Sequence, residues 1–150
     1  MPPERPRAGL GERHSLFLDA NVLFTAAHNP GGKAAFLFEM ASRPDAPWQL
    51  LSSAYAVEEA RRNLSVKSPH GLSAFDGLCT VLKMAPQPSV SSMPLALPDK
   101  DQPIWSAALA ARATHLLTGD IKDFGPHMNR PAATAGVTIQ TVGDYLAALR

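Results

Sequence analysis

The most constraining feature of this sequence is the alternation of short apolar runs with longer segments that have helical periodicity. The apolar runs cover residues 15–19, 48–53, 115–118 and 137–141. The helical segments are expected at 20–27, 33–41, 54–64, 69–84, 102–113 and 142–149. Runs this short and this aliphatic suit strands that are buried on both faces of a parallel sheet. The alternation therefore predicts an α/β fold in three layers, with a mostly parallel central sheet.

Three segments stand outside this alternation. Residues 120–136 are rich in Pro, Asn and Gly and show no clear crossover helix, although parallel neighbours need a right-handed crossover. Residues 89–91 form a short strand at best. Residues 1–13 carry three prolines and three arginines, Arg5, Arg7 and Arg13, and little that can enter a core. We therefore expect a flexible tail over 1–13, followed by a single domain over 14–150.

Composition excludes several classes of protein. With 45% hydrophobic and 18% charged residues among 150, the chain can fold around a core. The single cysteine, Cys79, excludes an internal disulfide framework and a cysteine-rich zinc site. No apolar run approaches the roughly 20 residues that span a bilayer, and residues 1–13 lack the apolar stretch of a secretory signal. We therefore expect a cytoplasmic, non-membrane protein, and its formal charge of +1 leaves nucleic acid binding open.

Four acidic residues are expected at one edge of the predicted sheet. Asp19 closes the first apolar run, Asp120 comes after Leu116, Leu117, Thr118 and Gly119, and Asp101 lies at the start of a helix. Glu59 lies one to two turns into the helix after the second strand. Because ligands of open α/β sheets bind beyond the carboxyl ends of the strands, all four side chains can converge on one pocket.

Carboxylates that converge repel each other, and a divalent cation offsets that repulsion. A set of oxygen ligands favours Mg²⁺ or Mn²⁺ over zinc. Such a centre suits phosphodiester hydrolysis, because the cation activates water and neutralises charge on the leaving oxygen. The pattern thus predicts a metal-dependent catalytic centre formed by Asp19, Glu59, Asp101 and Asp120.

Each acid also has a plainer interpretation. Asp19 and Asp101 can each be the N-cap of the helix that follows, and Asp120 can be a turn residue. Asp101 shares a helix face with the buried stripe of its helix, whereas Asp99 does not and is interpreted as a loop acid. Asp123 is either a second member of the site or a solvated turn residue.

Two adjacent glutamates compete for one position. Glu58 has Arg61 and Arg62 at i+3 and i+4, which is typical of a solvated ion-pair face. Glu59 shares its helix face with Tyr55 and is better placed to point inward. We therefore favour Glu59, while the register stays open.

Four short segments carry these acids. They are LFLDANVL (16–23), SAYAVEEARRNL (53–64), DKDQPIWSAA (99–108) and TGDIKDF (118–124). In this order they resemble the PIN domain family, in particular the VapC-like toxins of type II toxin–antitoxin systems. Each motif is short and degenerate, but the four together, over about residues 15–149, are more specific than any one alone.

The resemblance implies a Rossmann-like α/β/α sandwich and a Mg²⁺- or Mn²⁺-dependent endoribonuclease. It implies an antitoxin protein and a second copy of the chain as partners. The implied metal ligands are Asp19, Glu59, Asp101 and Asp120. The implied accessory residues are Asn21, Thr118 and Asp123. Glu58 and Asp99, which neighbour the implied ligands Glu59 and Asp101, leave the ligand register open.

Basic residues near the motifs can contact RNA phosphates. Arg61, Arg62 and Lys122 are the candidates, although an ordinary solvated helix surface is the simpler explanation for them. Two other functions stay open. One is a non-cleaving RNA-binding or protein-interaction module on the same fold. The other is small-molecule phosphoryl transfer, which the absence of a Gly-rich phosphate loop disfavours.

Overall fold

A five-stranded sheet forms the centre of the protein. The structure, a computed structural model, describes residues 13–89 and 91–149. The strands are β1 (His14–Leu18), β2 (Trp48–Ser52), β3 (Lys83–Met84), β4 (His115–Leu117) and β5 (Thr138–Gln140). They lie in the order β3-β2-β1-β4-β5, and all four neighbouring pairs are parallel. The predicted α/β fold with a parallel central sheet is confirmed.

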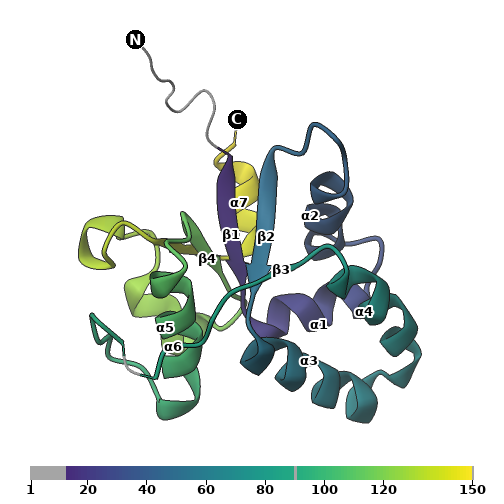
Figure 1. Cartoon of the computed structure of the whole chain (residues 1–150), viewed down its shortest axis with the longest axis horizontal. Helices are drawn as coiled ribbons and strands as arrows, with labels where there is room; N and C mark the ends of the chain where they lie inside the picture. The colour runs from purple at the N-terminus through teal and green to yellow at the C-terminus, as the bar shows by residue number, and fades with distance from the viewer. Residues whose placement is uncertain (1–12, 90, 150) are drawn as a thin grey trace.

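Helices cover the sheet on both sides, with α5 and α6 to the left of β1 and α2 to the right of β2 in Figure 1. The helices are α1 (Ala20–His28), α2 (Lys33–Ala41), α3 (Ala54–Lys67), α4 (Leu72–Cys79), α5 (Gln102–Ala110), α6 (Ile121–Phe124) and α7 (Val142–Ala147). Two of these helices have a hydroxyl side chain as the N-cap. The Ser53 hydroxyl accepts from a backbone N–H in the first turn of α3, and the Thr141 hydroxyl does the same for α7. Among the described residues, no helix combines the length and the apolar character needed to cross a membrane.

The middle strand is buried on both faces. Leu16, Phe17 and Leu18 of β1 have no exposed surface. Strands β2 and β4 pair with the two edges of β1, so its backbone groups are satisfied without water. The uninterrupted apolar run of β1 is therefore the pattern of a central parallel strand.

One predicted helix differs from the structure. The helix expected over 69–84 begins with a 3₁₀ turn at Pro69–Gly71 and ends at Cys79. Lys83–Met84 instead form the edge strand β3, which pairs with Leu51 and Ser52 of β2. Because this strand is two residues long and both of its residues are exposed, it has no apolar periodicity to reveal it.

Three other expectations concern loops and the tail. Residues 120–136 hold the single turn of α6 and two 3₁₀ turns, so the connection to β5 is compact but contains no long crossover helix. Ser89 and Ser91 are outside any strand, contrary to the short strand considered there, and residue 90 is not described. The flexible tail expected over 1–13 lies outside the described residues, except for Arg13.

The strand order creates a crevice between β1 and β4. From β1 the chain continues to β2 and β3 on one side, and later returns to β4 and β5 on the other. Ligands of open α/β sheets bind at such a switch point, outside the carboxyl ends of the strands. Asp19 directly follows β1 and Thr118 directly follows β4, so both lie at this crevice.

Candidate metal centre

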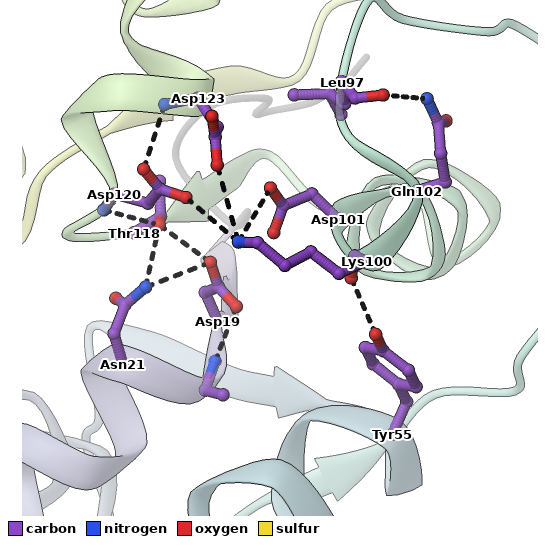
Figure 2. A network of polar contacts seen from close by, with 11 residues as sticks. Asp19, Asn21, Tyr55, Leu97, Lys100, Asp101, Gln102, Thr118, Asp120 and Asp123 are labelled. Atoms are coloured by element: carbon purple, nitrogen blue, oxygen red, sulfur yellow. Dashed lines mark hydrogen bonds and ion pairs between the residues drawn. The ribbon is translucent and has the colours of Figure 1, made fainter.

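Hydrogen bonds join the ends of β1 and β4 (Figure 2). The Thr118 hydroxyl donates to Oδ2 of Asp19 at 2.8 Å, and the Asn21 amide donates to the same oxygen at 3.2 Å. Oδ1 of Asp19 accepts from the backbone N–H of Ala20 at 2.7 Å. Asp19 therefore caps α1 and also faces the crevice, where it is only 5% exposed.

Asn21 connects the loop after β4 to the start of α1. The side-chain amide oxygen of Asn21, Oδ1, accepts a hydrogen bond from the backbone N–H of Gly119 at 2.7 Å. A Cβ at position 119 would lie 3.3 Å from that oxygen, so glycine permits this close approach. The Thr118 hydroxyl also accepts from the N–H of Asp120 at 3.0 Å. Asn21 and Thr118 thus fix the relative positions of Asp19 and Asp120.

Three carboxylates form a compact group beside this network. One oxygen from each of Asp101, Asp120 and Asp123 lies within 4.8 Å of the others. Asp101 precedes α5 but makes no capping hydrogen bond with its side chain, so the N-cap interpretation does not explain its burial. Asp120 accepts from the N–H of Asp123 at 2.9 Å and caps α6. The fold therefore brings three predicted acids together.

The ammonium group of Lys100 lies among these three carboxylates (Figure 2). Its Nζ is 3.4 Å from an oxygen of Asp101, 3.4 Å from one of Asp123 and 3.9 Å from one of Asp120. The Lys100 carbonyl accepts from the Tyr55 hydroxyl at 2.7 Å, which ties this turn to α3. The sequence patterns do not single out Lys100. The only signal is a lysine placed between two acids.

Burial and repulsion shift the pKa values of the site. Loss of solvent raises the pKa of Asp19, although the hydrogen bond from Thr118 opposes the shift. Burial raises the pKa of Asp101 to about 6; the charge of Lys100 opposes this shift, and the charges of Asp19 and Asp120 add to it. Burial is the largest single influence on Lys100 and lowers its pKa, but the charges and hydrogen bonds of Asp101, Asp123 and Asp120 together raise the pKa above its ordinary value. The negative charge of the site is thus only partly offset.

The two adjacent glutamates of α3 face different surroundings. Glu58 is exposed, and its carboxylate is 4.0 Å from Arg62 on the same helix. Glu59 is half-buried, and its charge contributes, after burial, to the raised pKa values of Asp19 and Tyr55. Glu59 therefore faces the crevice, and its role as a metal ligand stays a prediction.

The remaining candidates lie apart from the carboxylate group. Asp99 is exposed in the turn before α5. Arg61 donates to Asp76 of α4 at 2.8 Å, so its guanidinium faces α4 rather than the crevice. Arg62 and Lys122 are exposed, and the contact of Arg62 with Glu58 is a long, solvated one at 4.0 Å. The structure thus leaves Arg62 and Lys122 as the freer candidates for RNA contact.

Sequence comparison decides the family. The family model described as PIN domain matches residues 15–122, a span that holds every acid of the candidate centre except Asp123. The chain belongs to the PIN domain family. No curated protein matches the chain at a significant level.

Solved structures share the architecture of this PIN domain. The structure of VapBC2 from Rickettsia felis, bound to a DNA fragment from their promoter, aligns with a TM-score of 0.57 at 16% identity, over 85% of this chain and 98% of that chain. The structure of VapBC-1 from nontypeable Haemophilus influenzae aligns with a TM-score of 0.54 at 16% identity, over 86% and 98%. At this level of identity, the likeness establishes the fold.

The carboxyl edge of the PIN domain fits a divalent cation. Its donors are all carboxylate oxygens, which Mg²⁺ and Mn²⁺ prefer. Asp101 is buried without a capping bond, and its pKa is raised first by that burial and then by the charges of Asp19 and Asp120. With Asp120 and Asp123 within reach of the same point, the donor set matches the chemistry of such an ion.

Proposed function

We propose that this PIN domain is a Mg²⁺- or Mn²⁺-dependent endoribonuclease and the toxin of a toxin–antitoxin pair. One observation carries the proposal. Carboxylate oxygens of Asp101, Asp120 and Asp123 lie within 4.8 Å of one another at the switch point of the sheet, beside the buried Asp19. Because so much negative charge is unfavourable when it is withdrawn from water, a divalent cation is the ligand that best suits the site.

The residues of the centre have distinct proposed roles. Asp101, Asp120 and Asp123 would hold the cation together with the buried Asp19, and Glu59 would lie at the margin of the site. A bound divalent cation supplies Lewis-acid activation of water and offsets the charge that develops on a phosphodiester. The hydrogen bonds from Thr118 and Asn21 keep Asp19 in a single orientation, as partners of metal ligands commonly do.

A cavity next to the carboxylates gives the RNA a place to bind. It has a volume of about 630 Å³ and shares Asn21, Gly119 and Asp120 with the centre. Lys33, at the start of α2, also lines it and can contact a phosphate near the scissile bond. Lys122 is exposed beside Asp120 and is a second candidate for such a contact.

The proposed partners are an antitoxin protein and a second copy of the chain. The structural neighbours VapBC2 and VapBC-1 support the antitoxin partner, and the former is bound to promoter DNA. An endoribonuclease of this kind would act in the cytoplasm, where its RNA substrates are.

One observation favours a second function. Lys100 already brings a positive charge to Asp101, Asp120 and Asp123, so this group can persist in a folded protein without a metal. On that basis the domain would bind RNA or a protein without cutting it.

Cleavage assays separate the two functions. Purified protein is incubated with RNA in Mg²⁺, Mn²⁺ or EDTA, beside the variants Asp19→Asn and Asp101→Asn. The matched control is Asp45→Asn, which changes an exposed acid in the loop before β2. We expect cleavage that needs the metal and both acids and is unchanged in the control. Cleavage in EDTA, or by folded Asp19→Asn, would contradict the proposal. RNA binding without cleavage under any metal would favour the non-cleaving module.

A further inference from the structure

We propose that Lys100 is an internal cation that competes with the divalent metal for the carboxylates of Asp101, Asp120 and Asp123, and thereby sets the metal affinity of this PIN domain. The inference rests on the proposed function, because it takes these carboxylates as the metal ligands. It adds a determinant of metal binding on a residue that is not itself a ligand.

The first argument is position. Nζ of Lys100 lies 3.4, 3.4 and 3.9 Å from one oxygen each of Asp101, Asp123 and Asp120, so the ammonium is shared among all three rather than paired with one (Figure 2). Those are the acids whose oxygens lie close enough together to hold an ion. Two positive charges held by the same three carboxylates repel each other, so the ammonium opposes the binding of the metal.

The second argument is that the ammonium can leave. Its three contacts are longer than the roughly 2.7–2.9 Å of a strong charge-assisted hydrogen bond, and the Lys100 side chain is 66% exposed. The backbone at this position is fixed, because its carbonyl accepts from Tyr55 at 2.7 Å. The flexible side chain can therefore swing into water while the turn that carries Asp101 stays in place.

Two consequences follow from this exchange. Without metal, Lys100 offsets part of the repulsion among the carboxylates and stabilises the folded protein. With metal, binding must first displace the ammonium, so the apparent affinity is weaker than the carboxylates alone would give. Half-saturation of the domain then requires a higher metal concentration than it would without Lys100.

Direct Mn²⁺ binding tests the proposal. Free Mn²⁺ is measured by electron paramagnetic resonance during titration of the wild type, Lys100→Met and Lys122→Met. Lys122 is the matched control, because it is exposed on α6 beside Asp120 and, among the described residues, makes no ion pair with the carboxylates. We expect Lys100→Met to bind Mn²⁺ at least about tenfold more tightly than the wild type, and Lys122→Met to differ by less than about threefold.

Thermal unfolding provides the second readout. In EDTA, Lys100→Met should melt at a lower temperature than the wild type and Lys122→Met, and saturating Mn²⁺ should remove the difference. Lys100→Gln should behave as Lys100→Met does, and circular dichroism verifies that each variant is folded during titration.

The outcomes distinguish this inference from the proposed function. If the wild type binds Mn²⁺ and Lys100→Met binds it equally or more weakly, the competition is refuted and the metal site stands. An equal gain in Lys100→Met and Lys122→Met also refutes it, because it shows only a general effect of charge. If neither the wild type nor Lys100→Met binds Mn²⁺, both the inference and the proposed metal centre are wrong.

Discussion

The two ends of the sheet differ sharply in the side chains that they gather. At the carboxyl ends of β1 and β4, carboxylates crowd around one lysine. At the amino ends of the strands, His14, Trp48 and His115 pack against Tyr145 of α7. The ring centroids of His14 and His115 are 4.7 Å apart, and those of His115 and Tyr145 are 4.8 Å apart. Nδ1 of His14 is 2.6 Å from the Tyr145 hydroxyl.

The same physical cause acts in opposite senses at these two ends. Loss of solvent raises the pKa of Asp101 to about 6 and lowers the pKa of His115 to about 4. At the carboxyl end, the buried Asp101 is charged at neutral pH, and this charge lowers the stability of the folded protein. At the amino end, the His115 ring is neutral at the same pH and packs against Tyr145. We infer that activity and stability are separated along the strands, and the predictions below test that separation.

The largest expected effect is on cleavage by Asp19→Asn. We expect the single-turnover rate to fall more than about 100-fold, because a ligand charge is lost. Stability should fall by no more than about 1 kcal/mol, since the amide keeps the size of the side chain and relieves repulsion. Denaturant unfolding in EDTA measures the second quantity. A variant that loses activity only because it unfolds would break the comparison.

The opposite result is expected at the amino end. Tyr145 is 1% exposed, and Tyr145→Ala should lower the free energy of unfolding by about 3–5 kcal/mol through loss of buried aromatic surface. The cleavage rate per folded molecule should stay within about twofold of the wild type. Tyr145→Phe, which removes only the contact with His14, should cost about 1 kcal/mol. Wild-type stability in Tyr145→Ala would show that this cluster is not structural.

The paired glutamates sharpen the boundary of the site. Glu59→Gln should reduce cleavage about 10- to 100-fold, because its charge acts on Asp19. Glu58→Gln, one residue earlier, should leave the rate unchanged because Glu58 is exposed and its carboxylate faces Arg62 of the same helix. Steady-state cleavage at several Mn²⁺ concentrations measures both. The reverse ranking would move the ligand register to Glu58.

The smallest expected effect is the pH dependence of the amino end. The folded pKa of His115 is about 4, below its ordinary 6.5, because of burial and the neighbouring His14. The unfolded chain therefore binds more protons between these values, and stability falls as pH decreases through this range. Between pH 7 and pH 5, the melting temperature of His115→Gln should therefore fall by about 2 °C less than that of the wild type. Parallel wild-type and variant curves would show that His115 does not contribute.

The sequence predicts the fold where a pattern is local. Apolar runs such as Leu16–Leu18 reveal central strands, because a strand that is buried on both faces has apolar side chains at every position. The edge strand Lys83–Met84 has no such signature, because an exposed strand of two residues is defined only by its partner β2. Element type is thus readable from composition, whereas pairing depends on the completed sheet.

The candidate site is predictable to a similar degree. The acids Asp19 and Asp120 are recognisable because Asp19 directly follows an apolar run and Asp120 comes three residues after Leu117, at the end of another. Lys100 is not, because a long flexible side chain is assigned to solvent unless the positions of the surrounding carboxylates are known. Arg61 shows the converse, since its ion pair with Asp76 depends on how α3 packs against α4. The catalytic roles of the acids stay predictions until cleavage is measured.

The hydrogen bond between Thr118 and Asp19 spans 99 residues of sequence. During translation, β1 therefore leaves the ribosome long before the segment that must pair beside it. A nascent chain carries Asp19 from the start, yet lacks Thr118 and Asp120 until most of the polypeptide has been made. We expect the ribosome that synthesises this protein, and the messenger it is reading, to meet no assembled copy of the proposed nuclease centre until synthesis is nearly complete.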